Sequence, residues 1–275
     1  LQDVILSLRT MLEDSEHFEG VVPLLTDMLE PPSVDNISKS FNVLHEANMI
    51  ETNDDDGKLT SIGRMAGQLP VDLRLGRMVS LGILLGIGPE ACVLAMALSI
   101  PKSVFRIASP LIHSNPDELN YIVTQTFLGM HLMDNGMYSE PLMLFNIYLH
   151  WKKCSVTGNQ RYQFCDKLGL VFTRVKQFAS SVDHLLERVA KGLEDQAIRR
   201  HRLELGQGGM SPVRSKAPPK HVTDAINDAN TTYNTKYLVD LYPNCAQDFS
   251  QSMLNRLRLI LVWALGSSMI VRGKK

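Results

Sequence analysis

The chain has 275 residues, of which 44% are hydrophobic and 21% charged, and its formal net charge is −1. This length allows one large domain or two to three small ones, and the near-neutral charge excludes a global basic field that would attract nucleic acid. Any nucleic-acid site must therefore be local, or carried by segments outside this chain. Four widely spaced cysteines without a CxxC pair argue against a zinc site or disulfide framework and favour an intracellular, reducing compartment.

The N-terminal quarter of the sequence predicts helices followed by a hairpin. Apolar periodicity predicts helices over residues 4–12, 21–29 and 33–47, and Ser33 is a natural N-cap for the third. Two short extended runs, residues 49–52 and 58–60, surround a turn rich in Asp and Gly and predict a β-hairpin. Helices, a hairpin and a further helix are typical of a winged-helix module.

Residues 59–78 (LTSIGRMAGQLPVDLRLGRM) join this module to a differently built half. Pro70 cannot continue a helix and biases Leu69 toward an extended conformation. The Asp72 carboxylate can cap a new helix directly after it. The stretch therefore predicts a helix, a rigid elbow and a second helix.

Beyond the elbow the pattern is almost wholly helical. Helices are predicted over residues 73–85, 88–99, 115–134, 140–151, 164–205 and 249–270. A loop rich in Gly, Pro and Ser, predicted to be flexible, separates the last two over residues 206–222. Asn255, Arg256 and Arg258 interrupt the apolar run of the last helix, which favours a buried helix over a membrane span.

Motifs for catalysis or metal binding are absent from the sequence. It contains no GxxxxGK[ST] phosphate loop, and Gly86-Ile87-Gly88 lacks the third glycine of a dinucleotide site. His45-Glu46 fails the HExxH zinc pattern because residue 49 is Met. We therefore expect no catalytic residue and no metal site in this chain.

The order of motifs around the elbow resembles the C-terminal region of DEAH/RHA-type RNA helicases. In that family a winged helix leads into a helical "ratchet" domain through LTxLGxxxxxxPVDxRLxKM. Here the corresponding segments read LTSIGR at 59–64 and PVDLRLGRM at 70–78. The segments AMALS at 95–99, LFNIYLHW at 144–151 and FCDKLGL at 164–170 are similar to later family motifs in the same order.

The resemblance implies a mainly α fold with a winged-helix domain at residues 1–70 and a helical-bundle ratchet domain at 71–271. Residues 272–275 would begin a following domain. It implies an accessory region of an ATP-dependent helicase, with ATP and Mg bound by RecA-like domains that lie outside this sequence. This chain alone would then have no ATPase activity.

The resemblance also implies partners: single-stranded RNA, the RecA-like domains of the same protein, and a G-patch-like activator or an RNP complex. No membrane contact is expected. One departure is Ser139-Glu140-Pro141, where the family has a short SDH motif. That histidine, and any polar contact it supplies, is missing here.

Two groups of residues follow as candidates. The candidates for RNA phosphate contacts are Lys152, Lys153, Arg161, Lys176, Arg199 and Arg200. The candidates for a structural role between the two domains are Gly63, Arg64, Pro70, Asp72 and Arg74. For each cation the alternative is a solvated, charged helix face, which is the usual situation on helices.

Two other functions remain open from the sequence. The first is a protein-interaction scaffold derived from such a helicase, which no longer binds RNA. The second is a DNA-binding winged helix with residues 33–47 in the major groove. That helix carries Asp35, Glu46 and only one lysine, Lys39, which disfavours a phosphate-facing role.

Overall fold

The computed structural model describes residues 1–12, 20–155, 159–204 and 219–265, and this part of the chain is mainly α. The N-terminal helices are α1 (Gln2–Leu12), α2 (Val21–Thr26), α3 (Val34–Glu46) and α4 (Ser61–Gln68). The central ones are α5 (Leu73–Leu84), α6 (Gly88–Ser99), α7 (Pro116–Asp134), α8 (Glu140–Lys153), α9 (Gln160–Lys167) and α10 (Phe172–Glu204). The last are α11 (Lys220–Thr232), α12 (Thr235–Leu241), the short 3-10 helix η1 (Cys245–Asp248) and α13 (Gln251–Leu265). Of the helices described, none is both long and apolar enough to cross a membrane.

The predicted caps and stops are confirmed where they act locally. The Ser33 side chain accepts a hydrogen bond from the Asn36 N–H at the start of α3. Asn115 caps α7 in the same way, and Asn135 ends it in the left-handed region at φ 48°. α6 has the predicted bounds, with proline in its first turn.

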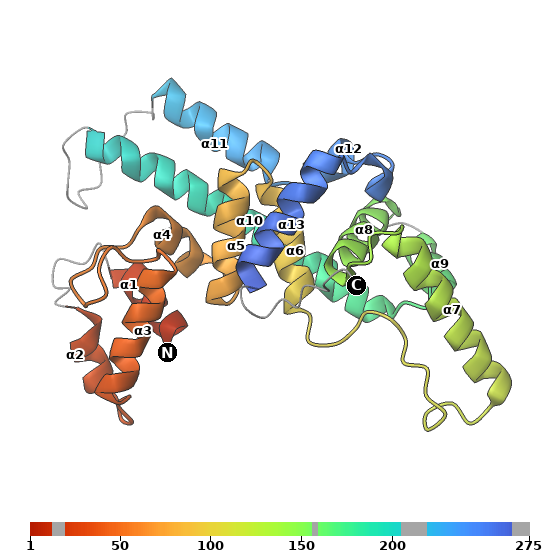
Figure 1. Cartoon of the computed structure of the whole chain (residues 1–275). Helices are drawn as coiled ribbons and strands as arrows, with labels where there is room; N and C mark the ends of the chain where they lie inside the picture. Colours follow the sequence, from red (N-terminus) through yellow and green to blue (C-terminus); the bar gives the residue numbers. More distant parts are fainter. Residues whose placement is uncertain (13–19, 156–158, 205–218, 266–275) are drawn as a thin grey trace, which may run out of the picture.

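The first hydrophobic core lies among α1–α4. Its buried side chains come from all four helices and from residues 49, 50 and 59 between α3 and α4. Ile5, Leu25 and Leu44 at its centre are fully buried. Figure 1 shows these helices as a separate lobe beside the rest of the chain.

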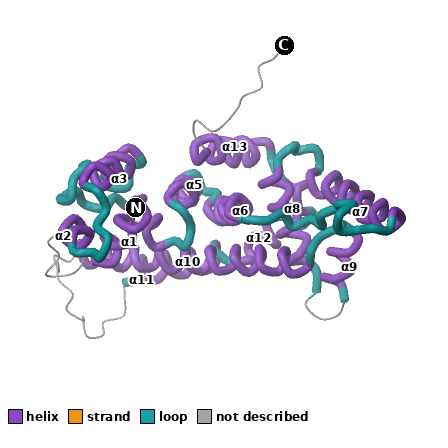
Figure 2. The backbone as a smooth tube through the Cα atoms, turned by 90° about the horizontal axis from the view of Figure 1, so that it is seen from below, coloured by secondary structure: helices purple, strands orange, loops and turns teal. Residues whose placement is uncertain are grey.

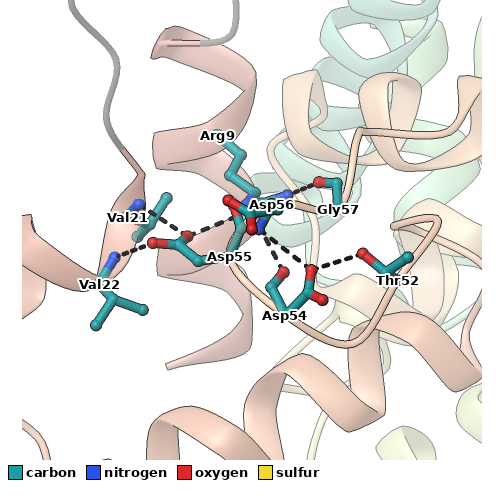
Figure 3. Close-up of polar contacts among 8 residues, drawn as sticks. All are labelled: Arg9, Val21, Val22, Thr52, Asp54, Asp55, Asp56 and Gly57. Carbon is teal, nitrogen blue, oxygen red and sulfur yellow. Dashed lines mark hydrogen bonds and ion pairs between the residues drawn. The ribbon is translucent and has the colours of Figure 1, made fainter.

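A buried arginine fixes the loop of this lobe (Figure 3). The Arg9 guanidinium on α1 donates to the backbone carbonyls of Asp55 and Gly57 and pairs with the Asp55 carboxylate at 3.2 Å. The two oxygens of that carboxylate accept the N–H groups of Val21 and Val22, each at 2.9 Å. Asp55 thereby satisfies the first N–H groups of α2 and holds α1, α2 and the loop together.

The predicted hairpin is much shorter than expected. Ile50 and Leu59 form a single antiparallel bridge, and the residues that the structure describes contain no strand. Backbone pairing is limited to the Glu51 N–H with the Lys58 carbonyl at 2.9 Å and the Thr60 N–H with the Met49 carbonyl at 3.0 Å. Beyond this pairing, the carbonyls of Asp55 and Gly57 accept from the Arg9 guanidinium on α1. Residues 51–58 therefore form a loop wrapped on α1.

The second core is built in layers. Figure 2 shows α13 on one side, α5 and α6 in the middle and the long α10 on the other side. α5 packs on α6 and α13, α6 packs on α8 and α10, and α11 runs beside α10. The predicted apolar stripe of α10 is confirmed, with Val175, Val182, Leu185 and Val189 all buried.

The single helix predicted for residues 164–205 is wrong, because two helices, α9 and α10, occupy this region. The chain turns at Gly169, which has φ 63°, a conformation that glycine adopts without strain. Leu170 then forms an antiparallel bridge with Phe105, and the Arg106 N–H donates to the Gly169 carbonyl at 2.8 Å. A pairing with a distant segment thus breaks the helix.

Other predictions concern the C-terminal third. Residues 206–218 of the predicted loop, residues 266–270 of the last helix and the start of a following domain at 272–275 lie outside the described residues. Residues 220–222 belong to α11, so the predicted loop does not extend to residue 222. The helices α11 and α12 were not predicted.

Candidate nucleic-acid interface

Lys152 lies at the C-terminal end of α8, inside a polar network. Its ammonium group pairs with one carboxylate oxygen of Asp183 on α10 and lies 5.5 Å from the centroid of the Tyr148 ring. The other oxygen of Asp183 accepts the Thr235 hydroxyl at 2.7 Å and the Tyr148 hydroxyl at 3.2 Å. Burial raises the pKa of Tyr148, so its hydroxyl stays a donor. Lys152 therefore contributes to the contact between α8, α10 and α12.

Lys153 is also engaged within the chain. Its ammonium group donates to the backbone carbonyls of Tyr242 and Pro243 at 2.7 and 2.6 Å and lies 3.0 Å from the Cys245 sulfur. These three residues reverse the chain after α12, where Cys245 has φ 58°. Lys153 thus fastens this turn to α8.

Arg161 on α9 lies over an aromatic ring. Its guanidinium carbon is 4.7 Å from the Trp151 centroid, a cation–π distance. Beside it, Tyr162 stacks on Phe172 with 3.9 Å between ring centroids and 58% of Tyr162 exposed. The aromatic surface at the start of α10 is therefore partly open to solvent.

Three candidates lie along α10, and they do not form one patch. Lys176 is exposed near its start, and the described residues supply its side chain with no hydrogen bond or ion pair. Arg199, which is half-buried and makes contacts of its own, and the exposed Arg200 lie near the other end. At 1.5 Å per residue the two groups are about 35 Å apart along the helix axis.

An open cleft near Lys176 brings together cations that the sequence reasoning missed. It lies between the C-terminal end of α6 and the start of α10, has a volume of about 560 Å³, and is lined by Ser99, Lys102, Thr173, Arg174, Gln177 and Ser181 among others. Lys102 is exposed, and Arg174 donates to the Ser103 carbonyl at 2.8 Å. Lys176 is not one of the lining residues, but it follows Thr173, at the edge of the cleft, by one helical turn.

The cleft could not be predicted from the sequence, because α10 begins later than the predicted helix. With a helix starting at residue 164, Arg174 lay in mid-helix and had no relation to Lys102. The signal in the sequence was Pro101, which follows the apolar pattern of α6 and directly precedes Lys102. Proline ends the helix there, so Lys102 lies at the end of α6.

The elbow residues lie where two helices meet. The Thr60 side chain caps α4 by accepting the Gly63 N–H at 3.0 Å. A Cβ atom on Gly63 would lie 2.0 Å from the Met49 carbonyl oxygen, so only glycine fits there. Arg64 donates to the Leu59 carbonyl at 2.9 Å.

Pro70 and Asp72 set the direction of the chain after α4. Exposed Pro70 follows Leu69, which ends α4 with an extended ψ of 139°. The Asp72 carboxylate accepts the Leu75 N–H at 2.8 Å and caps α5, as predicted. Arg74 is exposed.

The described residues contain no cluster of three His, Cys, Asp or Glu side chains that could hold a metal ion. Burial raises the pKa of Cys165 to about 11 and that of Cys92 further, so both thiols stay protonated at neutral pH.

Comparison with known proteins finds similarity to DExH-box ATP-dependent RNA helicases, and no family model matches the chain. Human ATP-dependent RNA helicase TDRD9 is 28% identical over 181 residues, which cover 61% of this chain and 12% of that protein. Human ATP-dependent RNA helicase DHX29 is 31% identical over 137 residues, 50% of this chain and 9% of that protein. Mouse DHX34, a probable ATP-dependent RNA helicase, is 27% identical over 178 residues, 64% of this chain and 14% of that protein. The matched region thus spans about a tenth of the length of these relatives.

Proposed function

We propose that this chain is the C-terminal winged-helix and ratchet region of a DEAH/RHA-type ATP-dependent RNA helicase. In this role it forms part of a single-stranded RNA channel and couples ATP-driven domain motion to RNA translocation or RNP remodelling. The observation that carries the proposal is the similarity to DExH-box helicases, at 27–37% identity over about half the chain.

The arrangement of the two cores supports the proposed domains. The first core extends from Ile5 to Ala66 and the second from Met65 to Ala264, so they meet at the end of α4. We place the boundary between a winged-helix domain and a ratchet domain at residues 70 and 71, within the Pro-Val-Asp elbow. The single bridge between Ile50 and Leu59 takes the position of the wing.

ATP and Mg belong, in this proposal, to RecA-like domains of the parent protein. The 275-residue sequence has no phosphate loop that could hold a nucleoside triphosphate. This chain would contribute RNA contacts and the relay of domain motion. A G-patch-like activator or an RNP complex would act on the same parent protein.

For RNA contacts we favour the cleft that contains Lys102, with Lys176 beside it. Both lysines are exposed, whereas Lys152 and Lys153 hold other parts of the chain. Phosphate contacts by such side chains carry no base readout. Binding by this region alone should be weak and strongly dependent on salt.

The test is binding of a fluorescent oligouridine of about twelve nucleotides to the 275-residue chain at several salt concentrations. We expect the double variant Lys102→Ala and Lys176→Ala to weaken binding and to reduce the slope of log K against log salt by about 0.7 for each phosphate that the variant no longer neutralises. Lys39→Ala on α3 is the matched control, because Lys39 is an exposed lysine on the other core.

Two results would separate the alternatives. If the double variant binds like the unchanged chain, the cleft is not an RNA site, and the scaffold alternative gains. That alternative is favoured by one observation, the engagement of Lys152 and Lys153 within the chain. If only Lys39→Ala weakens binding, α3 contacts the nucleic acid.

A further inference from the structure

The helix α7 buries only a narrow stripe. Of its 19 residues, the buried ones are Ile122, Thr126, Gly129 and Met133, spaced four, three and four apart on one side of the helix. A Cβ atom on Gly129 would lie 2.1 Å from the Leu168 carbonyl oxygen, so this side fits closely against the turn after α9. Figure 1 shows α7 extending away from the layered core. Its other sides face solvent.

The exposed sides of α7 are unusually apolar. Tyr121, Leu128 and Leu132 are 49%, 51% and 59% exposed. Their spacings of seven and four residues place them on one face of the helix. Phe127 is exposed on a neighbouring side, and Leu111 in the turn before α7 is fully exposed. Single exposed apolar residues are ordinary, but a contiguous apolar helix face is typical of an interaction site. We call Tyr121, Leu128 and Leu132 the α7 face.

The charge around the α7 face is one-sided. The sequence has no lysine or arginine from residue 107 to residue 151, while Asp117, Glu118, Asp134 and Glu140 lie within that range. Asp117 and Glu118 are exposed at one end of α7, and Glu140 is exposed at the start of α8 beyond its other end. Arg106, directly before this range, is paired with Asp166 on α9 at 2.8 Å.

This charge decides between possible occupants. Nucleic acid is disfavoured because this segment has no lysine or arginine that could meet a phosphate. A second copy of the chain is disfavoured because pairing α7 with itself, in either direction, brings acidic ends together. A polypeptide with basic residues beside an apolar stripe complements both features.

We propose that the α7 face is a docking surface for a helix of a partner protein, with an apolar stripe against Tyr121, Leu128 and Leu132 and Lys or Arg near Asp117 and Glu118. Such a helix would bind through apolar side chains at helical spacing, as in other complexes of an amphipathic helix with an apolar surface. The proposal does not depend on RNA binding by the cleft near Lys102.

The test uses two synthetic 18-residue helical peptides with the same leucine stripe. One carries lysines beside the stripe and the other carries glutamates, and binding to the 275-residue chain is measured by fluorescence anisotropy. We expect the lysine peptide to bind about tenfold more tightly, with a preference that weakens as salt is raised.

Variants of the chain locate the site. The double variant Leu128→Gln and Leu132→Gln should weaken binding of the lysine peptide by about tenfold or more. Leu84→Gln on α5 is the matched control, since Leu84 is an exposed leucine 70% accessible on another helix. Asp117→Lys with Glu118→Lys should reverse the preference toward the glutamate peptide. Circular dichroism melts check that all variants remain folded.

Three outcomes would overturn the proposal. The first is equal binding of both peptides, unchanged in the α7 variants. The second is loss of oligouridine binding in the Leu128 and Leu132 double variant, which would make α7 an RNA contact. The third is self-association of the chain that the same double variant abolishes. The oligouridine result with Lys102 and Lys176 is independent, so failure of one proposal is distinguishable from failure of the other.

Discussion

The Asp3 carboxylate on α1 accepts the backbone N–H of Leu73 at 3.1 Å, across 70 residues of sequence. Asp72 caps the Leu75 N–H of the same first turn. Two carboxylates, one on α1 and one in the elbow itself, thus satisfy the start of α5. This contact ties the first helix of the chain to the first helix after the elbow.

Removing either cap should destabilise the protein. We expect Asp72→Ala to lower the free energy of unfolding by about 1 kcal/mol, because one N–H of α5 loses its acceptor. Asp3→Ala should cost a similar amount or less, since this contact is exposed to solvent. Urea unfolding followed by circular dichroism measures both. Asp72→Ser is the control, because serine also caps and should restore most of the stability; an equal decrease in Asp72→Ser and Asp72→Ala would argue against the cap.

Gly63 should not tolerate a side chain. In Gly63→Ala the new Cβ meets the Met49 backbone carbonyl, which cannot rotate away, so we expect a decrease of about 1 to 3 kcal/mol in the free energy of unfolding. Gly67→Ala in the same helix is the matched comparison. Its Cβ meets the Thr10 hydroxyl, the end of a side chain, and alanine improves helix propensity. Thermal melts should therefore rank Gly63→Ala well below Gly67→Ala, and a reversed order would contradict the close contact.

Asp183 should matter more for stability than the exposed Lys176 on the same helix. Asp183→Ala leaves Lys152, Tyr148 and Thr235 without their shared acceptor, and we expect the free energy of unfolding to decrease by about 2 to 3 kcal/mol. Lys176→Ala on the same helix should change stability by less than about 0.5 kcal/mol, because Lys176 is exposed. Guanidinium unfolding gives both values. A small effect of Asp183→Ala would mean that the network is not maintained in solution.

Glu90 should make stability depend on pH. Burial raises the pKa of Glu90 above its ordinary value, although the Tyr242 hydroxyl, 2.6 Å away, partly opposes this. The folded state then binds the proton more tightly than the unfolded state, so stability decreases as pH rises from the ordinary carboxyl pKa through the raised one.

The isosteric variant Glu90→Gln tests this directly. Glutamine keeps an acceptor for Tyr242 and cannot ionise. We expect equal stability of the two proteins at about pH 4, below the unfolded-state pKa, and a more stable Glu90→Gln at pH 7. Thermal melts across this range provide the comparison. A difference that does not vary with pH would rule out ionisation of Glu90 as its cause.

Much of the helical pattern could be predicted from the sequence. Ser33, Asp72 and Asn115 were identified as caps, and the structure has all three accepting the expected N–H groups. Pro70 and Asn135 end helices where predicted. These features act within about four residues of the chain, so the neighbouring sequence contains all the information they need.

The candidate site was much less predictable. The sequence does not distinguish between the three candidate lysines Lys152, Lys153 and Lys176, which are all basic residues on or directly after predicted helices. Only the fold decides that the first two have partners 31 and 89 residues away and that Lys176 is exposed. The same holds for Lys102 and Arg174, which line one cleft because α10 begins at Phe172.

The sequence by itself therefore determined the mainly α character, most helix ends, the elbow at Pro70 and Asp72, and the resemblance to RNA helicases. The tertiary structure decided the break at Gly169, the short bridge at Ile50 and Leu59, and which cations are available to a ligand. The reason is range: caps and proline constraints are local, whereas Leu170 pairs with Phe105 and Arg9 holds the loop at Gly57 only once distant segments have packed.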